Sequence, residues 1–387
     1  MNEEFDSIRP YNDDEVKGAV EALIADRQFS RLLRGFLPWM PRCMRNGIIR
    51  AAFIGVHSTI GFQVRFMKPV VKYILHKCST GINFDHSAIH SGQERYTFVS
   101  NHRDIVLDSA LLDVLLFDNK FPTTCEIAIG DNLLIYPWIR ILVRRNKAFT
   151  VRRGLSLKET LASSQLMSRY IHHAIRDKHE NVWIAQREGR AKDSSDHTQE
   201  SVLKMLAYGG EGSLVEKLKE LNIVPLTISY EYDPCDYLKA MEFQLKRDDP
   251  TWKKSKQDDL DNMKTGIMGK KGHIEYKAAP CINAWLDELD GLAPKEFFQE
   301  LARRIDRNIH SNYRLFPGNY VAHDMLTGDT TYASMYTADD KLQFEKYLQS
   351  RIDLIDIENK DVDFLRERIL TMYANPVTNK SEATRQQ

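Results

Sequence analysis

The feature that most constrains the fold is a series of short apolar segments, between residues 95 and 276, that alternate with segments of helical periodicity. The residues at 223–230 form a continuous apolar run, which is typical of a strand buried on both faces. Helices are predicted between the strands, at 106–117 and 156–176. This alternation predicts an α/β fold with a mostly parallel sheet flanked by helices. The predicted strands are 95–100, 125–129, 149–151, 181–185, 223–230 and 273–276.

The predicted α/β domain occupies only part of the 387 residues, a length that predicts two or three domains or one large domain with attachments. We predict an N-terminal helical lobe at 1–84, the α/β domain at 85–325 and a helical C-terminal tail at 326–387. The C-terminal helices are predicted at 295–310, 339–351 and 362–372.

The N-terminal lobe is basic, although the 54 basic and 54 acidic residues of the whole chain balance. No Asp or Glu lies between Asp26 and Asp85, whereas that stretch holds ten Lys and Arg residues interleaved with large apolar side chains. Such a segment is typical of helices that lie on an anionic membrane surface. The alternative is an ordinary helical lobe whose basic face meets water or an acidic patch of the same protein. The aromatic residues on which the membrane interpretation rests are Phe36, Trp39, Phe53 and Phe62.

Composition excludes several other classes of protein. No apolar run reaches the roughly 18 residues of a membrane-spanning helix, and the polar start of the chain predicts no secretory signal. Five cysteines without a Cys-x-x-Cys pair indicate neither a disulfide framework nor a zinc ribbon, and fit a reducing compartment. A net charge of zero provides no field that would attract nucleic acid. We therefore expect a cytoplasmic protein, peripheral on the inner face of the cell membrane, with no nucleic-acid partner.

The strongest candidate for chemistry is the turn Ser100-Asn-His-Arg-Asp-Ile-Val-Leu-Asp108, which follows a strand and opens a helix. A histidine beside carboxylates can act as a general base on an alcohol, although a lone histidine near an aspartate is structural more often than catalytic. The triplet His-Arg-Asp also opens the protein-kinase catalytic loop, but Ser109 stands where that loop needs Asn, and no Asp-Phe-Gly follows. His102, Asp104 and Asp108 could instead bind a metal ion, but the sequence has no second His/Asp cluster to complete the set of ligands.

Two later turns carry positive charge and could bind an anion. Five basic residues surround the short strand at 149–151 and could form a phosphate or carboxylate clamp, or simply a solvated edge. The segment Gln186-Arg-Glu-Gly-Arg-Ala-Lys192 follows another strand, and its glycine permits close approach of the backbone to a ligand. The basic residues of the first of these turns are Arg144, Arg145, Lys147, Arg152 and Arg153.

In this order and spacing, the segments resemble the glycerolipid acyltransferase superfamily, which includes glycerol-3-phosphate and lysophosphatidate acyltransferases. Asn101-His102 matches the family's first motif, except that five residues instead of four separate the histidine from Asp108. Phe149-Thr-Val-Arg-Arg resembles the second motif, and Glu188-Gly-Arg resembles the third, with its arginine one place early. The strand Ile223-Val-Pro with the following Ile-Ser-Tyr-Glu resembles the fourth motif.

The resemblance implies a mechanism and a set of site residues. His102 would deprotonate the acceptor hydroxyl as it attacks an acyl thioester, and Asp108 would orient the imidazole, with Asp104 as the alternative partner. No Ser or Cys nucleophile, metal or cofactor is expected, because the acceptor alcohol attacks directly. Acyl-CoA or acyl carrier protein would bring the acyl group. The substrate-binding residues implied by the motifs are Asn101, Arg103, Phe149, Arg152, Arg153, Glu188, Gly189 and Arg190.

The implied function is transfer of a fatty acyl group from an acyl thioester to a hydroxyl of glycerol-3-phosphate in phospholipid biosynthesis. An alternative is the same chemistry on lysophosphatidate or another lyso-lipid. A second alternative is a catalytically silent lipid-binding protein of the same fold. The expected partners are the acyl thioester donor, a phosphorylated glycerol acceptor and an anionic membrane surface, with acyl carrier protein added if it carries the donor.

Overall fold

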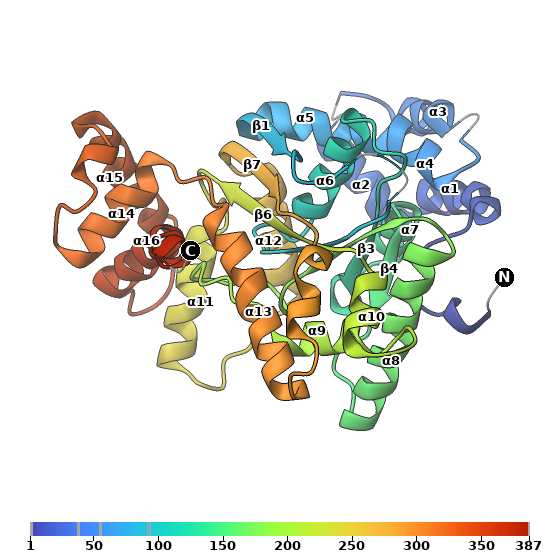
Figure 1. Ribbon diagram of the computed structural model, residues 1–387. Helices are drawn as coiled ribbons and strands as arrows, with labels where there is room; N and C mark the ends of the chain where they lie inside the picture. The colour runs from blue at the N-terminus through green and yellow to red at the C-terminus, as the bar shows by residue number, and fades with distance from the viewer. Residues whose placement is uncertain (1–2, 37–38, 54–55, 91, 93, 386–387) are drawn as a thin grey trace.

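A computed structural model describes residues 3–36, 39–53, 56–90, 92 and 94–385. Within these residues seven strands form one sheet, in the order β1-β7-β6-β2-β5-β3-β4 (Figure 1). The sheet is mostly parallel, as the sequence predicts, and only β6 and β7 run antiparallel to each other among the paired strands described. The strands are β1 (Ser79–Asp85), β2 (Thr97–Ser100), β3 (Cys125–Gly130), β4 (Ala148–Val151), β5 (Asn181–Ala185), β6 (Ile223–Tyr230) and β7 (Gly272–Ala278).

Helices cover both faces of the sheet, which explains the burial of all eight residues of β6. Alternate residues of β2 point to opposite sides: Val99 joins a core with α8 and α13, whereas Phe98 joins a core with α5 (Lys68–Cys78) and α6. The helices of this part of the chain are α6 (Leu107–Asp118), α7 (Pro137–Arg145), α8 (Leu157–Arg176), α9 (Glu200–Leu206), α10 (Leu214–Glu220), α11 (Asp236–Asp248), α12 (Lys256–Met268) and α13 (Pro294–Ser311). Short 3₁₀ turns lie at Glu3–Phe5, Asp13–Glu15, Asp131–Leu133, Ile282–Ala284, Leu286–Leu289 and Ala333–Met335.

The N-terminal lobe is helical, as expected, but its aromatic residues do not all face outward. Phe62 is fully buried in a small core with Phe29, so the prediction that Phe62 lies on a membrane-facing surface is wrong. Trp39 is 74% exposed, and the side chains of Phe36 and Phe53 lie outside the described side chains. The lobe consists of α1 (Val16–Ala25), α2 (Arg27–Phe36), α3 (Arg42–Phe53), α4 (Thr59–Phe62), a π-helical turn (Gln63–Met67) and α5 (Lys68–Cys78).

One strand, β1, lies where the sequence analysis places the end of the helical lobe. Its sequence Ser-Thr-Gly-Ile-Asn-Phe-Asp is too polar to predict a strand, and in the structure it forms a half-buried edge that pairs with β7. An edge strand has one neighbour only, so it needs less apolar surface than a central strand. The domain boundaries at 84 and 325 stay predictions.

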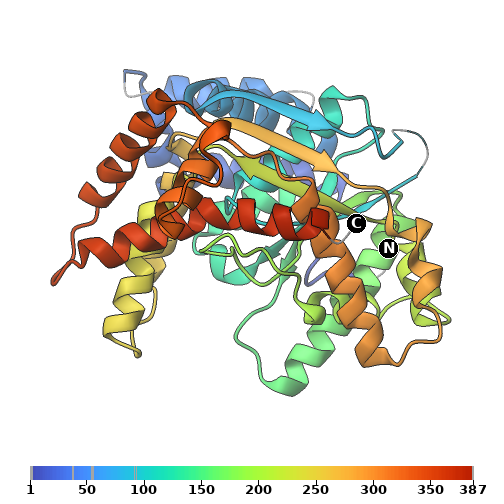
Figure 2. The ribbon, with the colours of Figure 1, turned by 60° about the vertical axis from the view of Figure 1, so that its left-hand side comes forward.

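Three C-terminal helices pack on one another and on α11, around Phe344, Leu348 and Leu365. They are α14 (Pro317–Thr327), α15 (Ala338–Asp353) and α16 (Val362–Arg385). Figure 2 shows α16 as a long helix whose C-terminal end meets α13. It continues past the predicted end at 372 although it contains Pro376, because a proline removes one helical hydrogen bond without unfolding a helix that is packed along its length.

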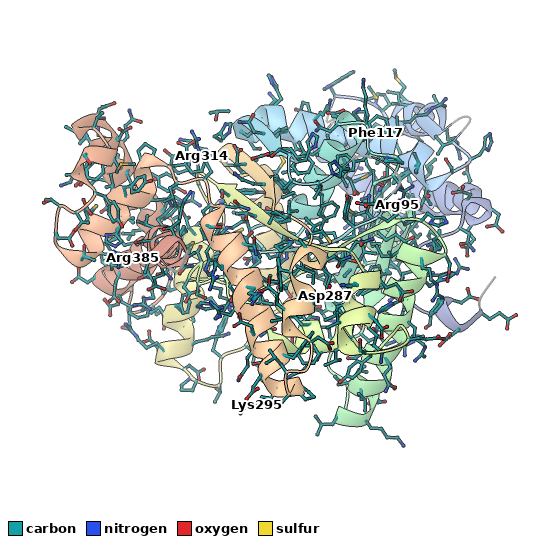
Figure 3. All side chains as sticks on the ribbon, in the orientation of Figure 1. Arg95, Phe117, Asp287, Lys295, Arg314 and Arg385 are labelled. Atoms are coloured by element: carbon teal, nitrogen blue, oxygen red, sulfur yellow. The ribbon has the colours of Figure 1, made fainter. Side chains whose placement is uncertain are left out.

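Arg314, labelled in Figure 3, lies between the sheet and these helices, and its backbone N–H donates to Ser229 Oγ on β6 (3.1 Å). In the part of the chain that the structure describes, no helix combines the length and the apolarity needed to cross a bilayer.

Candidate active site

The first motif forms the turn between β2 and α6, at the carboxyl end of a central strand. The carboxyl ends of β2, β3, β4, β5 and β6 share one edge of the sheet, because these strands are parallel. This edge is where α/β folds place their binding sites. His102 Nδ1 lies 2.7 Å from Asp108 Oδ2. The His102 side chain is 13% exposed and Asp108 is fully buried, so the pair has one side open to solvent and one side fixed in the protein.

Asp108 is held by four further groups. Its Oδ2 accepts the backbone N–H of Arg103 (2.6 Å) and of Asp104 (3.0 Å). Its Oδ1 accepts the hydroxyl of Tyr230 (3.1 Å), and its backbone carbonyl accepts the hydroxyl of Tyr276 (2.8 Å). Hydrogen bonds to a buried carboxylate stabilise its negative charge. Asp108 therefore occupies one fixed orientation, from which it holds the imidazole of His102.

Asp104 does not contact His102 and has a different task. Its Oδ1 accepts the backbone N–H of Val106 (2.9 Å) and of Leu107 (2.8 Å), which satisfies donors at the start of α6. Burial raises the pKa of Asp104, the charge of Asp108 raises it further, and Lys271 opposes both. The extra residue in the motif thus belongs to a turn closed by Asp104, and the structure places Asp108 beside the histidine.

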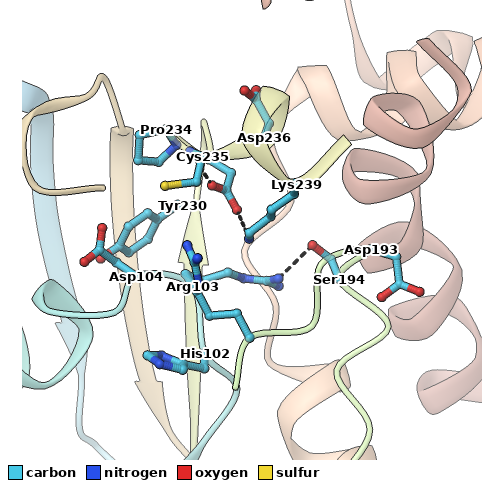
Figure 4. Close-up of polar contacts among 12 residues, drawn as sticks. His102, Arg103, Asp104, Asp193, Ser194, Tyr230, Pro234, Cys235, Asp236 and Lys239 are labelled. Carbon is cyan, nitrogen blue, oxygen red and sulfur yellow. Dashed lines mark hydrogen bonds and ion pairs between the residues drawn. The ribbon is translucent and has the colours of Figure 1, made fainter. Parts of the chain in front are cut away.

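Asn101 and Arg103, the neighbours of His102, are both engaged by the protein. Asn101 is fully buried; its amide accepts from the N–H of Ile228 (2.8 Å) and donates to the carbonyl of the same residue (2.9 Å). Arg103 is buried, pairs with Asp196 (2.6 Å) and donates to Ser194 Oγ (2.8 Å). Figure 4 shows Arg103 extending toward Ser194, with Asp104 on the opposite side. Each side chain thus joins β2 to another part of the domain, and a role of either in binding substrate stays a prediction.

The second motif separates into three environments. Phe149 is fully buried against Tyr170 (5.2 Å between ring centroids), so its side chain packs in the core and does not line an open site. Arg152 is exposed. Arg153 is partly buried and forms an ion pair with Glu188, which brings the second and third motifs together. Burial lowers the pKa of Arg153, and the charge of Asp131 opposes that effect.

The residues of the third motif also lie in different environments. Gly189 is exposed with φ of 70°, in the left-handed region that glycine adopts without strain. Arg190 turns inward and donates from Nη2 to Asn262 Oδ1 (2.9 Å), while its buried Nη1 has no hydrogen-bond partner among the described atoms. Arg190 therefore has a different partner from Arg153, and the binding of one phosphate by Arg152, Arg153 and Arg190 stays a prediction.

Sequence reasoning missed several residues that build this site. Tyr230 and Tyr276 look like ordinary strand residues, because their partner Asp108 is more than 100 positions away in the chain. Asp196 sits in a loop without a motif, but it receives Arg103 and the hydroxyl of Tyr313 (2.6 Å). The one available signal was that Tyr230 ends a buried strand at the edge where sites form.

One cluster of potential metal ligands is found among the described residues, and it lies outside this site. His323, Asp324 and Asp329 gather at the end of α14, in the C-terminal group of helices. Asp324 already accepts from the backbone N–H of Tyr332 and the hydroxyl of Tyr336. The residues around His102 provide no comparable group of ligands within the described chain.

The fold and the turn at 101–108 define an α/β domain with a His-Asp pair at the carboxyl edge of its sheet. Residues 81–229 match the family model described as Acyltransferase. Over these residues the match agrees with the resemblance to the glycerolipid acyltransferase superfamily that the motifs indicate.

Comparison with solved structures finds the 1-acyl-sn-glycerophosphate (LPA) acyltransferase PlsC from Thermotoga maritima. The identity is 10%, the TM-score is 0.38, and the match covers 75% of this chain and 95% of that chain. Comparison with curated proteins finds no significant match.

Proposed function

We propose that the protein transfers a fatty acyl group from an acyl thioester to a hydroxyl of glycerol-3-phosphate, with His102 as general base. The observation that carries this proposal is the hydrogen bond of Asp108 to His102 Nδ1 in an acyltransferase domain. Among the described residues Nε2 of His102 has no hydrogen-bond partner, and the ring is partly exposed. The imidazole is thus fixed on one side and free to take a proton on the other.

The chemistry then follows from the dyad. Nε2 of His102 removes the proton of the acceptor hydroxyl as the oxygen attacks the thioester carbonyl, and Asp108 stabilises the imidazolium that forms. The C–O ester bond forms, the C–S bond breaks, and the thiolate leaves with the proton that the imidazolium returns. Binding donor and acceptor side by side converts a bimolecular reaction into an effectively unimolecular one, which contributes much of the rate.

Arg152 and Arg153 are the residues that we propose for the acceptor phosphate. Arg152 is exposed at the end of β4, and Arg153 has only Glu188 as its side-chain ion-pair partner in the described chain. A phosphate could replace or share that partner, because guanidinium groups bind phosphate oxygens bidentately. Gly189 beside Glu188 leaves space for the glycerol backbone.

Membrane docking is the proposed role of the N-terminal lobe. Arg42 and Arg50 are exposed on α3, and Trp39 is exposed just before it. Exposed cations beside an exposed indole are suited to the interface of an anionic leaflet. This supports a peripheral position on the cytoplasmic face of the cell membrane, where a water-insoluble acyl product can be released.

The direct test is an acyl-acceptor assay with purified full-length protein. Acyl-CoA and acyl carrier protein are each offered as donor, with glycerol-3-phosphate or lysophosphatidate as acceptor. The proposal predicts ester formation with glycerol-3-phosphate at a higher kcat/KM than with lysophosphatidate. The reverse ranking would assign the protein to lyso-lipid acylation. Binding to liposomes without transfer to either acceptor would identify a silent lipid-binding protein.

A further inference from the structure

The carboxylate of Asp108 divides its hydrogen bonds unequally between its two oxygens. Oδ2 receives His102 Nδ1 and two backbone N–H groups from the turn. Oδ1 receives the hydroxyl of Tyr230 (3.1 Å), its one donor among the described residues. Because Asp108 is fully buried, no bulk water can replace that hydroxyl. We propose that Tyr230 is a positioning residue for catalysis, which acts through Asp108 to set the charge and orientation of the group that holds His102.

Tyr230 is well placed for this role. It is the last residue of β6, which pairs with β2 along the strand that leads into the His102 turn. Asn101 reinforces the connection between the two strands through its hydrogen bonds to Ile228. The position of the tyrosine relative to Asp108 is therefore fixed by the sheet. Burial, together with the neighbouring Tyr276 and Asp108, raises the pKa of Tyr230 well above its ordinary value, so the hydroxyl keeps its proton and remains a donor.

The groups that face Asp108 come from three elements, and each would affect its charge. His102, Arg103 and Asp104 lie in the turn, Tyr230 ends β6 and Tyr276 lies on β7. Arg103 forms an ion pair with Asp196, and the positive charge of Lys271 acts to lower the pKa of Asp104. Of the tyrosines, only Tyr230 hydrogen-bonds the carboxylate in the described structure, since Tyr276 donates to the backbone carbonyl.

This difference provides a matched pair of variants. Tyr230→Phe and Tyr276→Phe each remove one buried hydroxyl that donates to Asp108, from the carboxylate in the first variant and from the backbone in the second. A purely structural role predicts similar effects on activity and pH dependence, with any difference following thermal stability. A positioning role predicts that Tyr230→Phe changes the reaction more than Tyr276→Phe does, beyond what their thermal stabilities explain.

The experiment measures acyl transfer by both variants from pH 5 to 9, together with their thermal unfolding. The inference rests on the proposed function and predicts that Tyr230→Phe lowers kcat roughly tenfold, the effect of one hydrogen bond to a charged group. KM for both substrates should change less than about twofold, because the hydroxyl does not touch substrate. The acidic limb of the pH–rate profile should move to higher pH, because a carboxylate with one donor fewer attracts the imidazolium more strongly. Tyr276→Phe should move the profile less, because its hydroxyl donates to the backbone carbonyl of Asp108 and not to the carboxylate. Equal kcat values and superimposable profiles for the two variants would overturn the inference.

A second measurement does not depend on turnover. The low-field NMR resonance of the His102 Nδ1 proton, assigned by its absence in His102→Gln, reports the hydrogen bond to Asp108 directly. Tyr230→Phe should shift this resonance more than Tyr276→Phe does. If the resonance responds to Tyr230 but no acyl transfer is found, the proposed function fails and the positioning of the dyad stands. If transfer requires His102 and the resonance ignores Tyr230, the inference alone fails.

Discussion

Two parts of the candidate site lie at the same edge of the sheet but are built differently. The first is the turn at 101–108, and the second consists of the arginine turns at 152–153 and 188–190. In the first turn, Asp108 is fully buried and receives hydrogen bonds from both side chains and backbone. In the second, Arg152 is exposed and Arg153 has one exposed carboxylate as its ion-pair partner. The group that would do the chemistry is therefore assembled in advance, whereas the groups that would recognise the acceptor can still exchange their protein partner for a ligand.

The sharpest test of this difference compares the two aspartates of the turn. Asp108→Asn should lower kcat by about 100-fold or more, because the amide no longer stabilises an imidazolium. Asp104→Asn should have a mild effect on transfer and should act on stability, since Asp104 Oδ1 accepts N–H groups of the turn. Steady-state kinetics and thermal unfolding of both variants check this. A larger loss of kcat in Asp104→Asn would show that the dyad is wrongly assigned.

The arginine turn should respond in KM more than in kcat. Arg153→Ala and Arg152→Ala are each expected to raise KM for glycerol-3-phosphate about tenfold, the effect of one charge-assisted hydrogen bond. Arg153→Lys should recover only part of the loss, because an ammonium cannot bind a phosphate bidentately. Glycerol, which lacks the phosphate, serves as the control acceptor. Unchanged KM values in both alanine variants would place these arginines outside the acceptor site.

The N-terminal lobe extends the comparison to basic side chains that lie on the protein surface. Reversing the exposed pair in Arg42→Glu/Arg50→Glu should weaken binding to anionic liposomes at least several-fold, since each cation near such a surface contributes about 1 kcal/mol. Arg45 is left unchanged because it is buried and donates to the carbonyl of Met40 (2.6 Å). The double variant Lys341→Glu/Lys346→Glu, on the exposed face of α15, controls for net charge. Equal liposome binding by both double variants and the parent would assign the lobe a structural role.

A smaller effect concerns Asp113, on the same helix as Asp108. Burial raises the pKa of Asp113 to about 7 although the N–H of Cys125 and the charge of Lys147 oppose the rise. A carboxyl with a raised folded-state pKa favours the folded state when protonated, so its contribution to stability falls as pH rises from about 4 to above 7. Asp113→Asn should therefore flatten the dependence of Tm on pH in that window. A Tm profile parallel to that of the parent would contradict the assignment.

The sequence predicts well those features that depend on local pattern. Residues 223–230 form β6 with the predicted bounds, because a continuous apolar run of this length is typical of a strand buried on both faces. Helix α8 follows from periodicity and from Ser156, whose side chain caps its first turn with Glu159. His102 and Asp108 could be identified from the sequence because both lie in one segment of nine residues, 100–108.

Features that depend on distant neighbours could not be predicted. Nothing near Tyr230 in the sequence indicates that its hydroxyl meets Asp108. Arg190 comes directly after a glycine, which in the sequence suggests a ligand-binding arginine. In the structure it points inward and donates to Asn262 on α12, which packs against it. Similarly, Phe62 belongs to a basic, apolar segment, but whether an aromatic faces the core or the solvent depends on which helices pack together.

The central claim is that His102 is the base of an acyl transfer, and His102→Ala measures this most directly. With acyl-CoA and glycerol-3-phosphate, kcat/KM of the variant should fall by about 10²–10⁴-fold relative to the parent. Circular dichroism, Tm and liposome binding should remain close to those of the parent, since the side chain lies in a turn and touches the core through one edge-to-face contact with Trp183 (5.5 Å between ring centroids). A folded His102→Ala protein that transfers acyl groups within about tenfold of the parental rate would contradict the account.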